Sequence, residues 1–118
     1  MPNADYTVNV EQQKLIIGEI LGDVTDEISL ALEASINFET AHRVIEDFSE
    51  NNHQRYCVAP EFFQGVMACL KQYVRNAPIF NITPENLAKS MKENHNSIKR
   101  QIVDRYQAAA LDDPEGKE

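Results

Sequence analysis

The residue types best suited to chemistry occur at helical spacing in one short stretch, Glu39-Thr40-Ala41-His42 followed by Glu46. A Glu-x-x-His pair on a helix is what di-iron carboxylate bundles use to bind metal, but such a site needs two of these motifs and two further glutamates. Only one such motif falls within an expected helix, because the second Glu-x-x-His sequence, Glu50 to His53, lies in a polar stretch that reads as a loop. We therefore predict no metal site.

Two cysteines, Cys57 and Cys69, are the other candidates for nucleophiles or metal ligands. They are too few for a zinc site, and Cys69 falls on an apolar helical face, where an inert buried thiol is expected. The sequence has no glycine-rich phosphate loop and no serine within a nucleophile motif. Adjacent carboxylates such as Asp26 and Glu27 diverge around a helix. We predict neither enzymatic activity nor a cofactor.

The segment LAKSMKENHNSIKRQI, residues 87–102, indicates a different chemistry, which is contact with nucleic acid. Its spaced apolar residues predict two short helices locked together by a few side chains. These apolar residues are Leu87, Ala88, Met91, Ile98 and Ile102. Lys99 and Arg100 lie between the last two of them and are expected to point away from the core.

This segment resembles the helix-turn-helix superfamily of bacterial and phage repressors. Their usual pattern is Leu-Ala, two variable residues, Leu-Gly-Val, Ser, two variable residues, then Thr-Val-Ser-Arg-variable-Leu. The residues that match it in place are Leu87, Ala88, Met91, Ser97, Ile98, Arg100 and Ile102. At the turn, Lys92 and Glu93 replace the Gly and Val of the pattern. That glycine takes a left-handed backbone conformation, which Asn94 adopts more easily than lysine does.

The resemblance implies a supporting helix and a DNA-reading helix within residues 84–105. The residues that it places at duplex DNA are Lys89, Lys92, Asn94, His95, Asn96, Ser97, Lys99 and Arg100. Arginine suits the O6/N7 edge of guanine and asparagine the N6/N7 edge of adenine, while Ser97 suits a phosphate. Arg75 and Arg105 are further candidates for backbone contact, and Tyr106 is expected in the core.

Charge is divided unevenly along the chain, whose formal net charge is -8. Residues 1–50 contain two basic and eleven acidic side chains, whereas residues 51–111 contain eight basic and four acidic ones. An acidic half joined to a basic half indicates a charged partner. The alternative is an uneven composition of solvated faces.

Helical periodicity predicts an all-α fold of about six helices. We expect an acidic helical part at residues 1–55, a second helical part at 56–111 and a disordered acidic tail at 112–118. A first helix capped by Asn9 ends at Gly22 or continues toward Ile36, and residues 49–54 read as a loop. Further helices are expected to start at Asn37, Pro60 and Thr83-Pro84.

The first helix is more apolar than one buried face requires. Its surplus residues are Leu15, Ile16, Ile17, Ile20 and Leu21. Regulators of the helix-turn-helix type usually dimerise, so these side chains are candidates for the interface of a homodimer or for contact with a protein partner. The alternative is that they fill the core of a single chain.

Two interpretations remain open from the sequence. The leading one is a small dimeric transcriptional regulator that binds DNA. The other is an all-helical protein-interaction module, a subunit or an inhibitor, that makes no DNA contact. No apolar run approaches the roughly 18–20 residues that a membrane span needs, and the N-terminal residues do not read as a secretory signal. We therefore expect a cytoplasmic protein with reduced thiols and no membrane partner.

Overall fold

A computed structural model describes residues 10–112 of the chain, with the side-chain surroundings of residues 11–52 and 54–105. It contains five α-helices and two 3-10 helices, with no strand in the described range. The elements in order are α1 (Val10–Ala34), α2 (Phe38–Asn51), η2 (His53–Tyr56), α3 (Pro60–Asn76), η3 (Ala77–Phe80), α4 (Pro84–Glu93) and α5 (His95–Asp112). The all-α prediction is confirmed. The expected cap at Asn9, the tail beyond residue 112 and the side chain of Tyr106 lie outside the described residues.

α1 is one continuous helix, so the break that was considered at Gly22 is absent. Its buried side chains recur three and four residues apart: Ile17, Ile20, Leu21, Val24, Ile28 and Leu32. A glycine inside a helix costs about 1 kcal/mol relative to alanine, whereas each large apolar side chain that is buried contributes roughly 1.5–3 kcal/mol. The free energy gained by burying the apolar stripe therefore outweighs the cost of placing Gly22 inside the helix.

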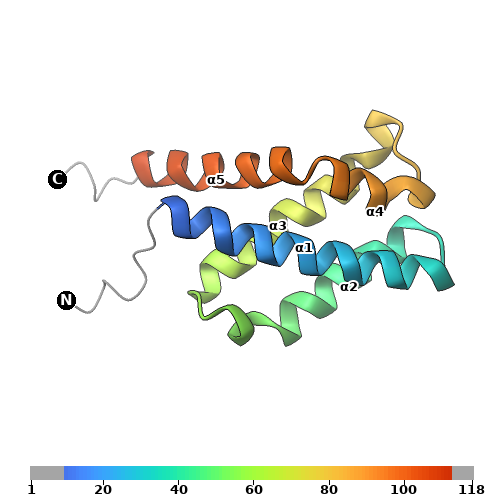
Figure 1. Ribbon diagram of the computed structural model, residues 1–118, viewed down its shortest axis with the longest axis horizontal. Helices are drawn as coiled ribbons and strands as arrows, with labels where there is room; N and C mark the ends of the chain where they lie inside the picture. Colours follow the sequence, from blue (N-terminus) through green and yellow to red (C-terminus); the bar gives the residue numbers. More distant parts are fainter. Residues whose placement is uncertain (1–9, 113–118) are drawn as a thin grey trace.

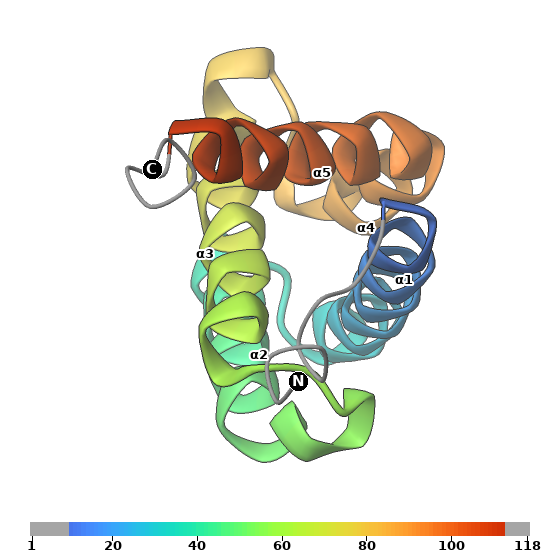
Figure 2. The ribbon, with the colours of Figure 1, turned by 90° about the vertical axis from the view of Figure 1, so that its left-hand side faces the viewer.

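α1 is the central helix, because α2, α4 and α5 all pack against it. Figure 1 shows α5 running back along α1, and Figure 2 shows α3 rising from α2 toward α5. α3 packs on α2 and has few close backbone contacts with α5. Three sides of the arrangement are thus closed by helix packing, and the side between α3 and α5 is more open.

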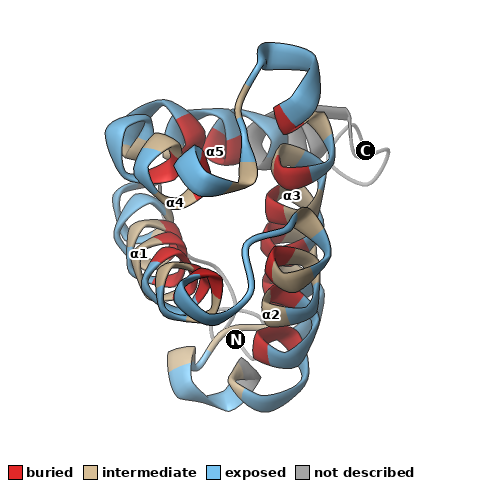
Figure 3. Cartoon of the chain, turned by 90° about the vertical axis from the view of Figure 1, so that its right-hand side faces the viewer, coloured by how far each residue is buried: buried red, intermediate tan, exposed pale blue. Residues whose placement is uncertain are grey.

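Buried residues line the sides of the helices that face one another (Figure 3). Three aromatic rings fill the end of the core beneath η2. Phe48, Tyr56 and Phe63 have ring centroids 5.9 to 6.3 Å apart, which is the range for favourable aromatic pairs. Phe63 is fully buried, so this group joins α2, η2 and α3.

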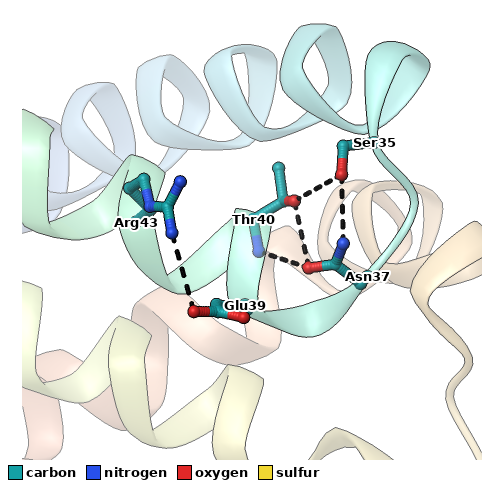
Figure 4. Close-up of polar contacts among 5 residues, drawn as sticks. All are labelled: Ser35, Asn37, Glu39, Thr40 and Arg43. Atoms are coloured by element: carbon teal, nitrogen blue, oxygen red, sulfur yellow. Dashed lines mark hydrogen bonds and ion pairs between the residues drawn. The ribbon is translucent and has the colours of Figure 1, made fainter.

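The start of α2 is set by polar side chains, as the sequence predicted for Asn37 (Figure 4). Asn37 has an extended backbone, and its Oδ1 accepts hydrogen bonds from Thr40 N at 2.7 Å and from Thr40 Oγ1 at 3.0 Å. Ser35 Oγ accepts from Asn37 Nδ2 at 3.0 Å. An exposed ion pair joins Glu39 and Arg43 at 3.6 Å. The bond to Thr40 N satisfies one of the first backbone donors of the helix, and the side-chain contacts hold Asn37 in place.

The loop predicted at residues 49–54 is shorter than expected, because α2 continues to Asn51 and η2 begins at His53. η2 is attached to α1 by polar contacts. Tyr56 Oη donates a hydrogen bond of 2.5 Å to Asp23 Oδ2, and Arg55 lies 3.7 Å from the same oxygen and 5.6 Å from the centroid of the Tyr56 ring. Burial and the bond to Asp23 raise the pKa of Tyr56.

The first prediction concerns Tyr56→Phe, which removes the bond to Asp23. Near neutral pH the variant should lose about 1–2 kcal/mol of unfolding free energy, as expected for a hydrogen bond to a charged acceptor. Because the pKa is raised in the folded state, this contribution is complete below the ordinary tyrosine pKa of about 10 and declines at higher pH. Urea denaturation from pH 7 to 11 should show the wild-type advantage shrinking above pH 10, and a constant difference would contradict the assignment.

The second prediction uses the two glycines of α1. A Cβ at Gly22 would meet no atom within 4 Å, whereas one at Gly18 would lie 3.3 Å from Lys99 Cδ. Gly22→Ala should therefore raise the unfolding free energy by about 0.5–1 kcal/mol through helix propensity. Gly18→Ala should gain less, because Lys99 must shift. Thermal melts of both variants test this, and a lower melting temperature for Gly22→Ala would contradict a continuous α1.

Candidate functional site

The apolar residues proposed as an interface on α1 mostly belong to the core of the chain itself. Ile17, Ile20 and Leu21 are fully buried, and Ile16 packs against the core from a partly buried position. Leu15 alone of the five is well exposed, at 71%. The fully buried side chains offer no surface to a second chain, so the single-chain alternative accounts for them.

A single residue, Asn94, joins α4 to α5. Its N–H donates to Ser90 O at 2.9 Å at the end of α4, and its C=O accepts from Ile98 N at 2.8 Å at the start of α5. Figures 1 and 2 together show that α5 leaves α4 in a new direction. We call this junction the α4–α5 corner. Tyr73 Oη and Ser90 Oγ, 2.7 Å apart, attach the corner to α3.

The corner differs from the turn that the helix-turn-helix pattern implied. α4 continues through Lys92 and Glu93, the two residues that depart from the pattern. Asn94 has a φ of -103°, and the described non-glycine residues with positive φ are Cys57 and Asn81. The expectation of a left-handed residue at this turn is therefore wrong. Hydrogen bonds from Asn94 Nδ2 to Ser90 O and Oγ cap α4 instead.

The residues that the pattern placed at DNA are divided between two sides of the corner. The exposed ones are Lys89, Lys92, Asn94, Asn96, Ser97 and Arg100. His95 and Lys99 are partly buried and lie over Gly18, where a Cβ would be 3.7 Å from His95 Nε2 and 3.3 Å from Lys99 Cδ. Lys99 therefore faces α1, not the same side as Arg100.

Ala88, the small residue expected at the α4–α5 crossing, lies instead in a shallow depression between α1 and α4. Ser29, Leu32 and Glu33 of α1 line this depression with it. Its small side chain therefore serves the packing of α4 on α1.

Ion pairing follows the division of charge along the chain. The described ion pairs are Lys14–Glu11, Arg43–Glu39 and Arg55–Asp23, all of them on exposed side chains. The cations from Lys71 to Arg105 have no ion-pair partner among the described residues. The cations of residues 1–50 and Arg55 are thus paired with carboxylates of the acidic half, whereas the cations from Lys71 to Arg105 remain without ion pairs among the described residues.

A groove of about 290 Å³ lies between α3 and α5, on the open side of the helix arrangement. Its walls are mainly apolar and include Tyr73, Ala77, Ile82, Ile98 and Ile102. Arg105 contributes the charged group of the lining. This cavity falls just below the usual size of pockets for small ligands, roughly 300–1,000 Å³, and has room for one or two apolar side chains of a partner.

η3 presents two large exposed apolar residues, and the second of them reaches this groove. Ile79 and Phe80 are 73% and 68% exposed, and Phe80 lines the groove. We call these two residues the η3 tip; the segment projects from the rest of the structure in Figures 1 and 3. Asn81 N donates to Pro78 O at 3.0 Å, and Ile82 N to Ala77 O at 2.9 Å. Ile79 and Phe80 are therefore held in a turn that backbone hydrogen bonds close on both sides.

The sequence analysis assigned no functional residue between the helices expected to start at Pro60 and Thr83-Pro84, and so missed the η3 tip. Two adjacent large apolar residues directly after Pro78, in a connector too short to bury them, were the available signal. Asn81 supports this turn in the left-handed conformation, with φ 63°, which asparagine tolerates better than most residues.

The remaining chemical candidates form no reaction centre. Cys57 is exposed, and Cys69 is partly buried at the groove, where burial raises the pKa of its thiol. Burial, followed by the charge of Arg75, lowers the pKa of His42. Within the described part of the chain, no three His, Cys, Asp or Glu side chains are grouped to hold a metal ion.

Comparison with known proteins gives no relative. No family model, curated protein or solved structure matches the chain. Among the described helices, none is both long and apolar enough to cross a membrane. The candidate surfaces of the molecule are therefore the α4–α5 corner and the η3 tip with the adjoining groove.

Proposed function

We propose that this protein is an all-helical protein-interaction module that binds its partner through the η3 tip and the adjoining groove. The observation that carries the proposal is the exposure of Ile79 and Phe80 beside an apolar groove, on a turn closed by backbone hydrogen bonds. Single exposed apolar residues are common on protein surfaces. Two adjacent ones next to an apolar cavity are the arrangement expected of an interface anchor.

The energetics favour an interaction of this kind. Burying a large apolar side chain contributes roughly 1.5–3 kcal/mol, so the η3 tip alone supplies a substantial driving force. Ordering a flexible loop opposes binding, but the turn at Pro78 and Asn81 is already closed. The surface differs from the acidic half that the sequence favoured for this role, because the described lining of the groove includes no residue of α1.

A second candidate function is binding of duplex DNA at the α4–α5 corner, with the chain acting as a dimeric regulator. It is supported by the exposure of Lys89, Lys92 and Arg100 and by the exposed Asn96 on α5. Phosphate contacts from such cations supply most of the affinity for DNA. We rank it second because Lys99 faces α1, and because Glu85 and Glu93 add negative charge to the same surface.

The third prediction tests the interaction module. A tagged double variant, Ile79→Ser with Phe80→Ser, should lose its bound protein partner, with at least about ten-fold less recovered on purification from the producing cells. Leu30→Ser is the matched control, because Leu30 is 64% exposed on α1, and it should retain the partner. Quantitative mass spectrometry measures the recovery. The proposal would be refuted if the wild type, the double variant and Leu30→Ser all recovered the same bound proteins in equal amounts.

The fourth prediction tests the DNA candidate. Wild-type protein should retard pooled genomic duplex fragments at low salt, and binding should weaken steeply as salt rises. The pair Lys89→Ala and Arg100→Ala should abolish retardation, whereas Arg43→Ala, an exposed cation of the acidic half, should have no effect. Absence of retardation by the wild type at about 50 mM salt would exclude this candidate.

A further inference from the structure

The described lining of the groove combines an apolar floor with positive charge. Arg105 is its charged member, and no carboxylate is among the described lining residues. Arg75 Nη1 lies 3.5 Å from Oε1 of Gln72, another lining residue, so its guanidinium reaches the wall of the groove. Neither arginine is ion-paired within the described residues. Their side-chain partners are uncharged, the Cys69 thiol for Arg105 and the Gln72 amide for Arg75, so both positive charges remain unneutralised.

Resting on the function proposed above, we infer that the occupant is an acidic amphipathic helix of a partner protein. It places one large apolar side chain in the groove and carboxylates against Arg105 and Arg75. On a helix, residues three or four positions apart share a face. One acidic residue a turn before the anchor and another a turn after it therefore meet the two arginines while the anchor stays between α3 and α5.

The shape and chemistry of the walls favour a protein segment over a nucleic acid. The floor is largely aliphatic, with Ile82, Ile98 and Ile102, whereas sites for single-stranded nucleic acid present aromatic platforms beside a basic track. Phe80 adds one exposed ring at the rim. An aliphatic or aromatic side chain fills such a cavity, and an anchor of this kind is typical of a helix bound in a groove.

The same chain displays two surfaces of a related kind on α1. Leu15 is 71% exposed and Leu30 is 64% exposed. Each has an exposed carboxylate about one turn before and after it: Glu11 and Glu19 around Leu15, and Asp26 and Glu33 around Leu30. A second copy could therefore compete for the groove. Self-association is accordingly an outcome that the test must separate from binding of a partner helix.

The fifth prediction is tested by selection from a library of displayed helical peptides, with the full chain as target. Peptides that compete for the η3 tip should be enriched in Leu, Ile or Phe with Asp or Glu three or four residues away. Arg105→Glu combined with Arg75→Glu should weaken the selected peptides at least about ten-fold in fluorescence anisotropy at low salt. It should also shift a new selection toward Lys and Arg. Arg43→Glu should change neither result.

The outcomes distinguish this inference from the proposed function. Selected peptides that bind at the η3 tip without acidic enrichment, and tolerate the double charge reversal, overturn the acidic helix but leave the interaction module standing. Peptides insensitive to Ile79→Ser with Phe80→Ser overturn both. Light scattering that shows a dimer dispersed by Leu15→Asp or by Leu30→Asp identifies the occupant as a second copy and also overturns the inference. Circular dichroism and thermal melts confirm that each variant is folded.

Discussion

Burial of the apolar stripe of α1 is the constraint on which the rest of the structure depends. The stripe runs from Ile17 to Leu32 without a gap, and α2, α4 and α5 each cover part of it. A helix of this length cannot bury such a stripe alone, so most of its stability comes from the helices packed on it. The same requirement fixes the rotation of α5, which turns Ile98 and Ile102 inward and leaves Arg100 outside.

Local signals predicted the helix starts well. Asn37, Pro60 and Pro84 begin helices where expected, because a capping side chain or a proline acts on backbone groups within a few residues. Gly22 illustrates the limit of such signals. Its low helix propensity is overridden because apolar side chains before and after it in α1 are buried. Sequence periodicity indicates which residues share a face, but not which other helix that face meets.

The candidate site was harder to predict for the same reason. Lys99 was expected outside with Arg100 because both are cations in a polar segment, yet the packing of α5 places Lys99 over Gly18. The turn was expected at Lys92 and Glu93 by analogy with a motif, whereas hydrogen bonds from Asn94 N and Nδ2 to Ser90 O define it here. The groove depends on the spacing between α3 and α5, which no local pattern encodes.

Tyr73 belongs to both candidate surfaces. Its ring lines the groove, and its hydroxyl lies 2.7 Å from Ser90 Oγ, within the hydrogen bonds that close the α4–α5 corner. An occupant that displaces this ring alters the support of the corner, and by linkage anything that rearranges the corner alters affinity at the groove by the same factor. One phenol thus makes the two faces of the protein thermodynamically dependent, although one is an apolar groove and the other an exposed junction of two helices.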